Sequence, residues 1–255
     1  MYRAFNLVEF PWKQYDQGAA LIDRTTQIVK KALADFVNNR RIDGAKLSEH
    51  WFPQVNANVF ISHSHTDLDN ATNLAGFLKE EFNLDSFLDW SVWGHADALL
   101  RHIDDEYCWN PTSKTYSYRK RNGSTSHAHM MLSTALGKML DKVECVIFLN
   151  TPNSITSEDA VSKTKSPWLY FELGLLNMIR PRKPQRLLLE SLSNKRAFAN
   201  LEIDYAVDLG NMPTLNEDLL KLWAQARLNP DDSAVHSLDL LYQMVPEPTR
   251  KAQGR

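Results

Sequence analysis

The chain has little cysteine, no excess of either charge and no long apolar run. Its two cysteines, Cys108 and Cys145, lie far apart and form no metal-binding or redox motif, so we expect both to be reduced. The 29 basic and 31 acidic residues nearly cancel, which argues against a polyanionic partner such as nucleic acid. No apolar stretch of about 18 residues is present to span a bilayer. The N-terminus lacks the basic-then-apolar layout of a signal peptide. We therefore expect a cytoplasmic protein with no membrane partner.

Apolar patterning divides the chain into three parts. Residues 1–57 are expected to form a helical N-terminal extension, because apolar residues recur at near-helical intervals between 17 and 39. Residues 58–227 carry the main domain, and residues 228–255 a C-terminal helix and tail.

The main domain alternates strand and helix patterns. Strands are expected at 58–64, 84–90, 143–150, 186–190 and 203–209, and helices at 67–82, 98–107, 130–142, 166–179 and 216–226. Continuous apolar strands between helices indicate a parallel sheet covered on both faces. We expect a flavodoxin-like parallel five-stranded sheet flanked by helices. Ligands bind such sheets outside the carboxyl ends of the strands.

A polar insert at about 107–129 interleaves aromatic and basic side chains, as single-strand nucleic-acid binders do. The residues concerned are Tyr116, Tyr118, Arg119, Lys120 and Arg121. A patch of five residues in a near-neutral protein falls short of a basic face. We therefore expect a mobile surface loop or a contact for a partner protein, with no nucleic acid bound.

Glu172 is the single charged residue in the run from Trp168 to Ile179. Ser166 can cap the expected helix and Pro167 suits its first position. Trp168 and Glu172 are four residues apart and share a face. A carboxyl group partly stripped of water tends to hold its proton more tightly, and such groups are enriched at functional sites. From the helix alone, an ordinary boundary glutamate paired with a nearby cation is an equally open interpretation.

Three motifs at strand ends resemble those of TIR (Toll/interleukin-1 receptor) domains, in particular the bacterial ones. NVFISHSHTD, starting at Asn58, resembles the first TIR strand. SFLDWSVW, starting at Ser86, resembles the second strand with its terminal aspartate and the BB loop that follows. SPWLYFE, ending at Glu172, matches the W-x-x-x-E pattern that carries the catalytic glutamate of NAD-cleaving TIR domains. The resemblance covers residues 58–227 and departs at 107–129, which is longer than the usual connection.

The resemblance implies cleavage of the nicotinamide–ribose bond of NAD⁺, giving nicotinamide and ADP-ribose or a cyclic ADP-ribose-type signal. Glu172 would be catalytic, by holding the ribose hydroxyls and stabilising an oxocarbenium ion. Candidate substrate-binding residues are Phe60, Ser62, His63, Asp89, Trp93 and Trp168. Core packing is the favoured role of Trp168, and Asp89 is expected to orient the BB loop. By this resemblance NAD⁺ would be the substrate, and no other cofactor and no metal is expected.

The resemblance also implies a setting. Stand-alone TIR proteins with a short extension resemble the signal-producing components of antiphage systems such as Thoeris, in which a separate effector protein responds to the product. An NAD-depleting toxin is the other possibility within the family. Self-association through TIR surfaces is expected in either case.

Two alternatives remain. Many TIR domains are non-catalytic adaptors, although these commonly lack the glutamate. The His63-x-His65-x-Asp67 loop opens like the zinc motif of metallo-β-lactamases. However, Leu68 stands where that motif requires histidine, and the downstream ligands are absent. A zinc hydrolase is therefore the weaker alternative.

Overall fold

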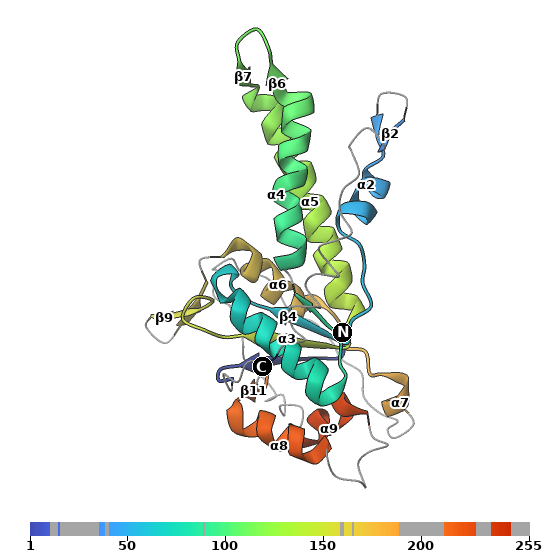
Figure 1. Ribbon diagram of the computed structural model, residues 1–255, viewed down its shortest axis with the longest axis vertical. Coiled ribbons are helices and arrows are strands. Elements are labelled where there is room, and N and C mark those ends of the chain that lie inside the picture. The colour runs from blue at the N-terminus through green and yellow to red at the C-terminus, as the bar shows by residue number, and fades with distance from the viewer. Residues whose placement is uncertain are drawn as a thin grey trace, which may run out of the picture.

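The computed structural model is an α/β fold built on a five-stranded, all-parallel sheet (Figure 1). It describes residues 1–10, 15, 36–38, 41–88, 90–158, 161–164, 166–188, 212–227 and 236–245. The strand order is β11-β1-β8-β4-β5. The strands are β1 (Arg3–Leu7), β4 (Val59–Ser62), β5 (Ser86–Leu88), β8 (Cys145–Leu149) and β11 (Thr214–Leu215). The expected parallel sheet flanked by helices is confirmed.

Strand β1 lies inside the sheet, between β8 and β11. The assignment of residues 1–57 to a separate helical extension was therefore wrong for residues 3–7. A flavodoxin-like sheet has the order 2-1-3-4-5. Here β5, β4 and β8 take the first three places, and the N-terminal strand takes the fourth. The helix expected at 17–39 lies almost wholly outside the described residues.

Strand β1 was not predicted from the sequence, because it contains a buried arginine. The RAFNL strand begins with Arg3, whose side chain is almost fully buried. Its Nη1 donates to the carbonyl oxygens of Tyr242 (3.3 Å) and Val245 (2.5 Å). The guanidinium also lies 4.8 Å from the centre of the Phe5 ring. Carbonyl groups at the end of a C-terminal helix thus offset the cost of burying this charge.

Helices cover both faces of the sheet, and each face has its own apolar core. Alternate strand residues point to opposite faces, so Phe60 enters one core and Ile61 the other. The face that holds Phe60 is covered by α2 (Gly44–Trp51), α4 (Trp90–Ile103), α5 (Tyr118–Lys142) and α6 (Pro167–Met178). The opposite face is covered by α3 (Leu68–Phe82), α8 (Glu217–Arg227) and α9 (Ser237–Met244).

The polar insert forms ordered structure, so the mobile loop expected at 107–129 was wrong. Helix α4 continues into a π-helical turn, η3 (Asp104–Cys108), and a hairpin of β6 (Trp109–Asn110) and β7 (Thr115–Tyr116). Helix α5 begins at Tyr118, twelve residues before the helix expected from the apolar pattern. Together α4, η3, the hairpin and α5 form an arm that projects from the body (Figure 1).

The outer half of α5 was not predicted from the sequence, because its buried residues are small. Its buried side there consists of Ser124 and Ala128, so no large apolar residue marks the helical period. Ser124 and Arg121 both bond to the buried carboxylate of Asp104, at 2.5 and 2.9 Å. Burial alone would raise the pKa of Asp104, but these hydrogen bonds outweigh it and hold the pKa below its usual value. Polar contacts therefore fasten the arm where apolar packing is thin.

The remaining elements are short. Residues 185–188 form helix α7 (Gln185–Leu188), so the strand expected at 186–190 was wrong. The strand expected at 203–209 lies outside the described residues. Two further hairpins pair β2 (Val37–Asn38) with β3 (Arg41–Ile42) and β9 (Thr156–Glu158) with β10 (Val161–Lys163). None of the described helices is long and apolar enough to cross a membrane.

Candidate functional site at the carboxyl edge of the sheet

The carboxyl ends of β4 and β8 lie side by side at a topological switch point. From β4 the chain runs through α3 to β5 at one edge of the sheet. From β8 it leaves in the opposite direction, towards β11. In open α/β sheets, ligands bind where successive connections diverge in this way. The topology thus selects the residues that follow β4 and β8 as the candidate site.

Glu172 lies at this point, on the helix that follows β8. Helix α6 begins as expected, with the Ser166 hydroxyl accepting from the backbone N–H of Leu169 (3.3 Å). The Glu172 side chain has 0% exposure, and its Oε2 accepts a hydrogen bond from Ser62 Oγ at 2.6 Å. Ser62 is the last residue of β4 and is also fully buried. A buried glutamate is therefore tied directly to the end of a central strand.

The two loops at the switch point are joined by a second buried acid, Asp67. Its carboxylate accepts hydrogen bonds from Thr151 Oγ1 (2.5 Å) and Asn153 Nδ2 (2.9 Å), both in the loop after β8. Asp67 is 4% exposed. In the sequence, Asp67 stood out only as part of the His63-x-His65-x-Asp67 motif. A signal was present, since hydroxyl and amide donors directly follow β8, but it needed the knowledge that β4 and β8 are neighbours.

The other predicted binding residues are spread over different surroundings. His63 is buried beside Ser62, with Nδ1 3.2 Å from the carbonyl oxygen of Ile61. Phe60 points into the core, where its ring lies 5.3 Å from that of Phe87. The half-buried Trp168 meets the ring of His129 on α5 edge to face, at 5.4 Å. The structure therefore brings Ser62 and His63 to Glu172's end of the sheet, while Phe60 packs inside the core.

The loop expected after the second strand does not form. Helix α4 begins at Trp90, so most of the segment read as a BB loop is helical, and that prediction was wrong. The apolar pattern placed the helix start at 98, because tryptophan, serine and glycine in residues 90–97 obscure the period. Asp89 lies outside the described residues, and the structure describes only the backbone of Trp93.

A small cavity opens beside the switch point, between the ends of β1 and β8. Its volume is about 330 Å³. This rim cavity is lined by Val8, Glu9, Phe10, Leu149, Asn150, Thr151 and Glu217. Thr151 belongs both to the cavity and to the hydrogen bonds of Asp67. The sequence gives no sign of this cavity, because its lining depends on the place of β1 in the sheet.

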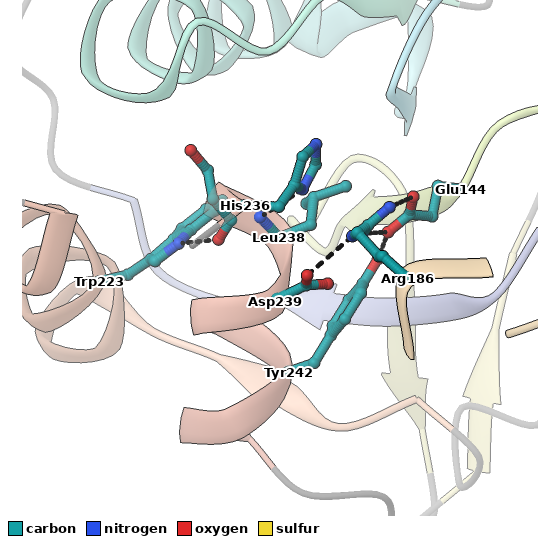
Figure 2. A network of polar contacts seen from close by, with 8 residues as sticks. Glu144, Arg186, Trp223, His236, Leu238, Asp239 and Tyr242 are labelled. Carbon is teal, nitrogen blue, oxygen red and sulfur yellow. Dashed lines mark hydrogen bonds and ion pairs between the residues drawn. The ribbon is translucent and has the colours of Figure 1, made fainter. Parts of the chain in front are cut away.

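A separate polar cluster lies at the amino end of β8 (Figure 2). Glu144, His236 and Asp239 come close enough for their side chains to share a metal ion. Arg186 of α7 already bonds to both carboxylates, at 2.8 Å to Glu144 and 2.7 Å to Asp239. Tyr242 donates to Glu144 at 3.0 Å, and burial raises the pKa of this phenol. The arginine supplies the positive charge, so the cluster fastens α7 and α9 to the sheet.

The three residues of the proposed zinc motif do not come together in the structure. Among the described residues, His63, His65 and Asp67 do not form a group that could hold a metal ion. His65 is exposed, whereas His63 is buried and Asp67 is held by Thr151 and Asn153. The spacing of the motif in the sequence therefore does not translate into a shared position in space.

A scan against protein-family models and searches of curated proteins and of solved structures found no match. The resemblance to TIR domains therefore rests on the three sequence motifs.

Proposed function

We propose that this protein is a TIR-like NAD⁺ nucleosidase or cyclase in which Glu172 is the catalytic carboxylate. The observation that carries the proposal is the buried hydrogen bond between Glu172 and Ser62, located at the topological switch point of the sheet. This is the position at which α/β sheets bind ligands. The W-x-x-x-E motif independently marks the same glutamate.

The chemistry suits a carboxylate in apolar surroundings. The bond between ribose C1′ and the pyridinium nitrogen breaks, and its electron pair stays on nitrogen, so nicotinamide leaves neutral. Positive charge develops on the ribose, and a carboxylate close by stabilises it. Ser62 holds one carboxylate oxygen in a fixed direction, which limits reorganisation during the reaction. Attack by water gives ADP-ribose, and attack by an internal nucleophile gives a cyclic product.

Burial of the glutamate sets a condition on this activity. With 0% exposure, Glu172 contacts no solvent and therefore no dissolved substrate in the described conformation. The proposal requires a rearrangement that opens the carboxyl edge near α6, brought about by substrate, by a trigger or by self-association. We accordingly expect turnover by the isolated chain to be slow and to rise with protein concentration.

The biological setting follows from the resemblance alone. We propose that the product acts as a signal to a separate effector protein in antiphage defence, with direct NAD⁺ depletion as the second possibility. The protein would act in the cytoplasm, with NAD⁺ as substrate and without a further cofactor.

Incubation with NAD⁺ at high protein concentration tests the proposal. Nicotinamide, ADP-ribose and cyclic products would be separated by chromatography and identified by mass spectrometry. Glu172→Gln keeps the size of the side chain and its ability to accept from Ser62, but removes the charge. We expect this variant to release nicotinamide at least 100-fold more slowly. Glu49→Gln, at an exposed position on α2, is the matched control and should retain full activity.

A non-catalytic interaction module is the second candidate. The complete burial of Glu172 and the exposed aromatic residues at the end of the arm both favour it. If purified protein releases no nicotinamide at any concentration, with or without crowding agents, the adaptor function would replace the enzymatic one.

A further inference from the structure

The end of the arm exposes an unusual concentration of aromatic side chains. Trp109 and Tyr116 on the hairpin are 43% and 40% exposed, and Tyr118 at the start of α5 is 81% exposed. Trp109 and Tyr116 pack edge to face at 5.0 Å, so the hairpin presents them as a fixed pair. Exposed Arg119 and Lys120 follow directly. We call these five residues the arm tip. Trp, Tyr and Arg are the residues most enriched at the energetic centres of protein interfaces.

The arm tip carries positive charge that is not used in ion pairs with the described residues. Arg121 is bound to Asp104, and Tyr116 donates to Asp105, so those groups are satisfied within the arm. Arg119 and Lys120 form no ion pair with any of the described residues. Two such cations are too few for a nucleic-acid surface, which needs a wider basic face. They suit a compact acidic and apolar partner.

The rim cavity has the complementary properties. Val8 in its lining is 43% exposed, and the largely buried Phe10 and Leu149 complete the apolar lining. Glu9 and Glu217 place two carboxylates around it, and among the residues that the structure describes Glu217 forms an ion pair with the half-exposed Lys221 alone. Its volume of about 330 Å³ is at the small end of the range for sites that take a compact group.

The two surfaces cannot meet within one molecule. The β6–β7 hairpin and α8, which begins at Glu217, lie at opposite ends of the longest axis of the molecule (Figure 1). Helix α5 alone is 25 residues long, or about 37 Å. Any contact between the arm tip and the rim cavity therefore joins two copies of the chain.

We propose that the arm tip of one copy docks in the rim cavity of a second copy. The aromatic rings cover the apolar lining, and Arg119 and Lys120 face Glu9 and Glu217. Such a contact is head to tail, so each copy keeps a free tip or a free cavity, and the assembly extends into a ring or a filament. The exposed parts of three aromatic rings cover roughly 400 Å² or less, about half of a standard interface per partner. The association is thus weak and depends on protein concentration. The contact lies next to the loop of Thr151 and could supply the opening that Glu172 requires, but it stands independently of catalysis.

Sedimentation velocity of the full chain, over protein concentrations from micromolar to near millimolar, tests the proposal. Wild-type protein is expected to form progressively larger species at low salt. Arg119→Glu/Lys120→Glu in the arm tip, and separately Glu9→Lys/Glu217→Lys in the rim cavity, should each weaken association at least tenfold. Lys138→Glu, an exposed charge reversal on the body end of α5, should not.

A mixture of the two variants gives the decisive test. In the mixture a reversed tip meets a reversed cavity and an unaltered tip meets an unaltered cavity, so association should return although each variant alone associates weakly. Circular dichroism confirms that each variant is folded. A monomeric wild type at every concentration would overturn the proposal, and so would association that neither double variant reduces. Tip-dependent binding to anionic vesicles or to single-stranded DNA, without self-association, would assign the arm tip to that other partner instead.

Discussion

At the scale of single residues, the hydrogen bond between Ser62 and Glu172 lies in the candidate site and also joins two elements of the fold. Both side chains are completely buried and come from elements far apart in the chain. The sequence could mark Glu172, because it is the one charge in an apolar helix, and Ser62, because it ends an apolar strand. It could not show that they touch, since the pairing depends on how α6 packs over the end of β4.

Ser62→Ala tests the contribution of this bond. The substitution removes a donor from a fully buried carboxyl group, so we expect the free energy of unfolding to fall by about 1–3 kcal/mol. Urea denaturation at neutral pH measures the loss. Ser126→Ala is the control, because the exposed Ser126 on α5 donates to a backbone carbonyl of its own helix and its loss should cost less than about 0.5 kcal/mol. Equal losses in the two variants would show that the bond adds nothing to stability.

At the scale of elements, polar contacts hold the structures that sequence patterns failed to show. Strand β1 carries a buried arginine, and the outer half of α5 is fastened by Asp104, so neither displays a regular apolar period. Elements with ordinary apolar patterns, such as α3 and β8, lie where the sequence predicts them. Hydrophobic periodicity finds elements that pack through apolar faces and misses those whose burial depends on satisfied polar groups.

Helix α9 should respond to pH through its cap. His236 Nδ1 accepts from the backbone N–H of Leu238, so the ring must be neutral there. Burial, followed by the positive charge of Arg186, lowers the pKa of His236, while Glu144 and Asp239 act in the opposite direction. Below the usual value of about 6.5, the unfolded chain takes up a proton that the folded chain resists. The stability that the neutral His236 contributes is complete above that pH. It is lost as the pH falls towards the pKa of His236 in the folded state.

His236→Asn separates this effect from other titrations. Asparagine can cap the helix without gaining a proton. We expect the variant to become more stable relative to wild type as the pH falls from 7.5 to 5.5. Thermal unfolding in matched buffers measures this difference. A difference that stays constant across this range would exclude His236 as the source.

At the scale of the whole molecule, the N-terminal strand makes the fold a single unit. Strand β1 pairs with both β8 and β11, and Leu7 accepts a backbone hydrogen bond from Asn150 at the candidate site. The motifs that resemble TIR domains lie within residues 58–227 and gave no reason to look for a strand before them. Strand order depends on pairing between distant segments, which local patterns do not encode.

Removal of residues 1–8 tests this dependence. The shortened chain loses the partner of two strands and the buried side chains of Phe5 and Leu7, so we expect it not to fold. Replacement of residues 109–117 by a short glycine turn is the matched control and should leave the body folded, because that hairpin lies at the far end of the arm. Far-ultraviolet circular dichroism and cooperative thermal unfolding report the outcome. A cooperatively folding chain that begins at residue 9 would contradict the role of β1.

We propose that Glu172 serves cleavage of NAD⁺ at the carboxyl edge of the sheet. The most direct measurement is the rate of nicotinamide release by wild type, Glu172→Gln and Glu49→Gln at the same high protein concentration. We expect release by wild type and by Glu49→Gln, and a loss of at least about 100-fold in Glu172→Gln. Equal release by all three proteins, or release by none of them, would contradict it.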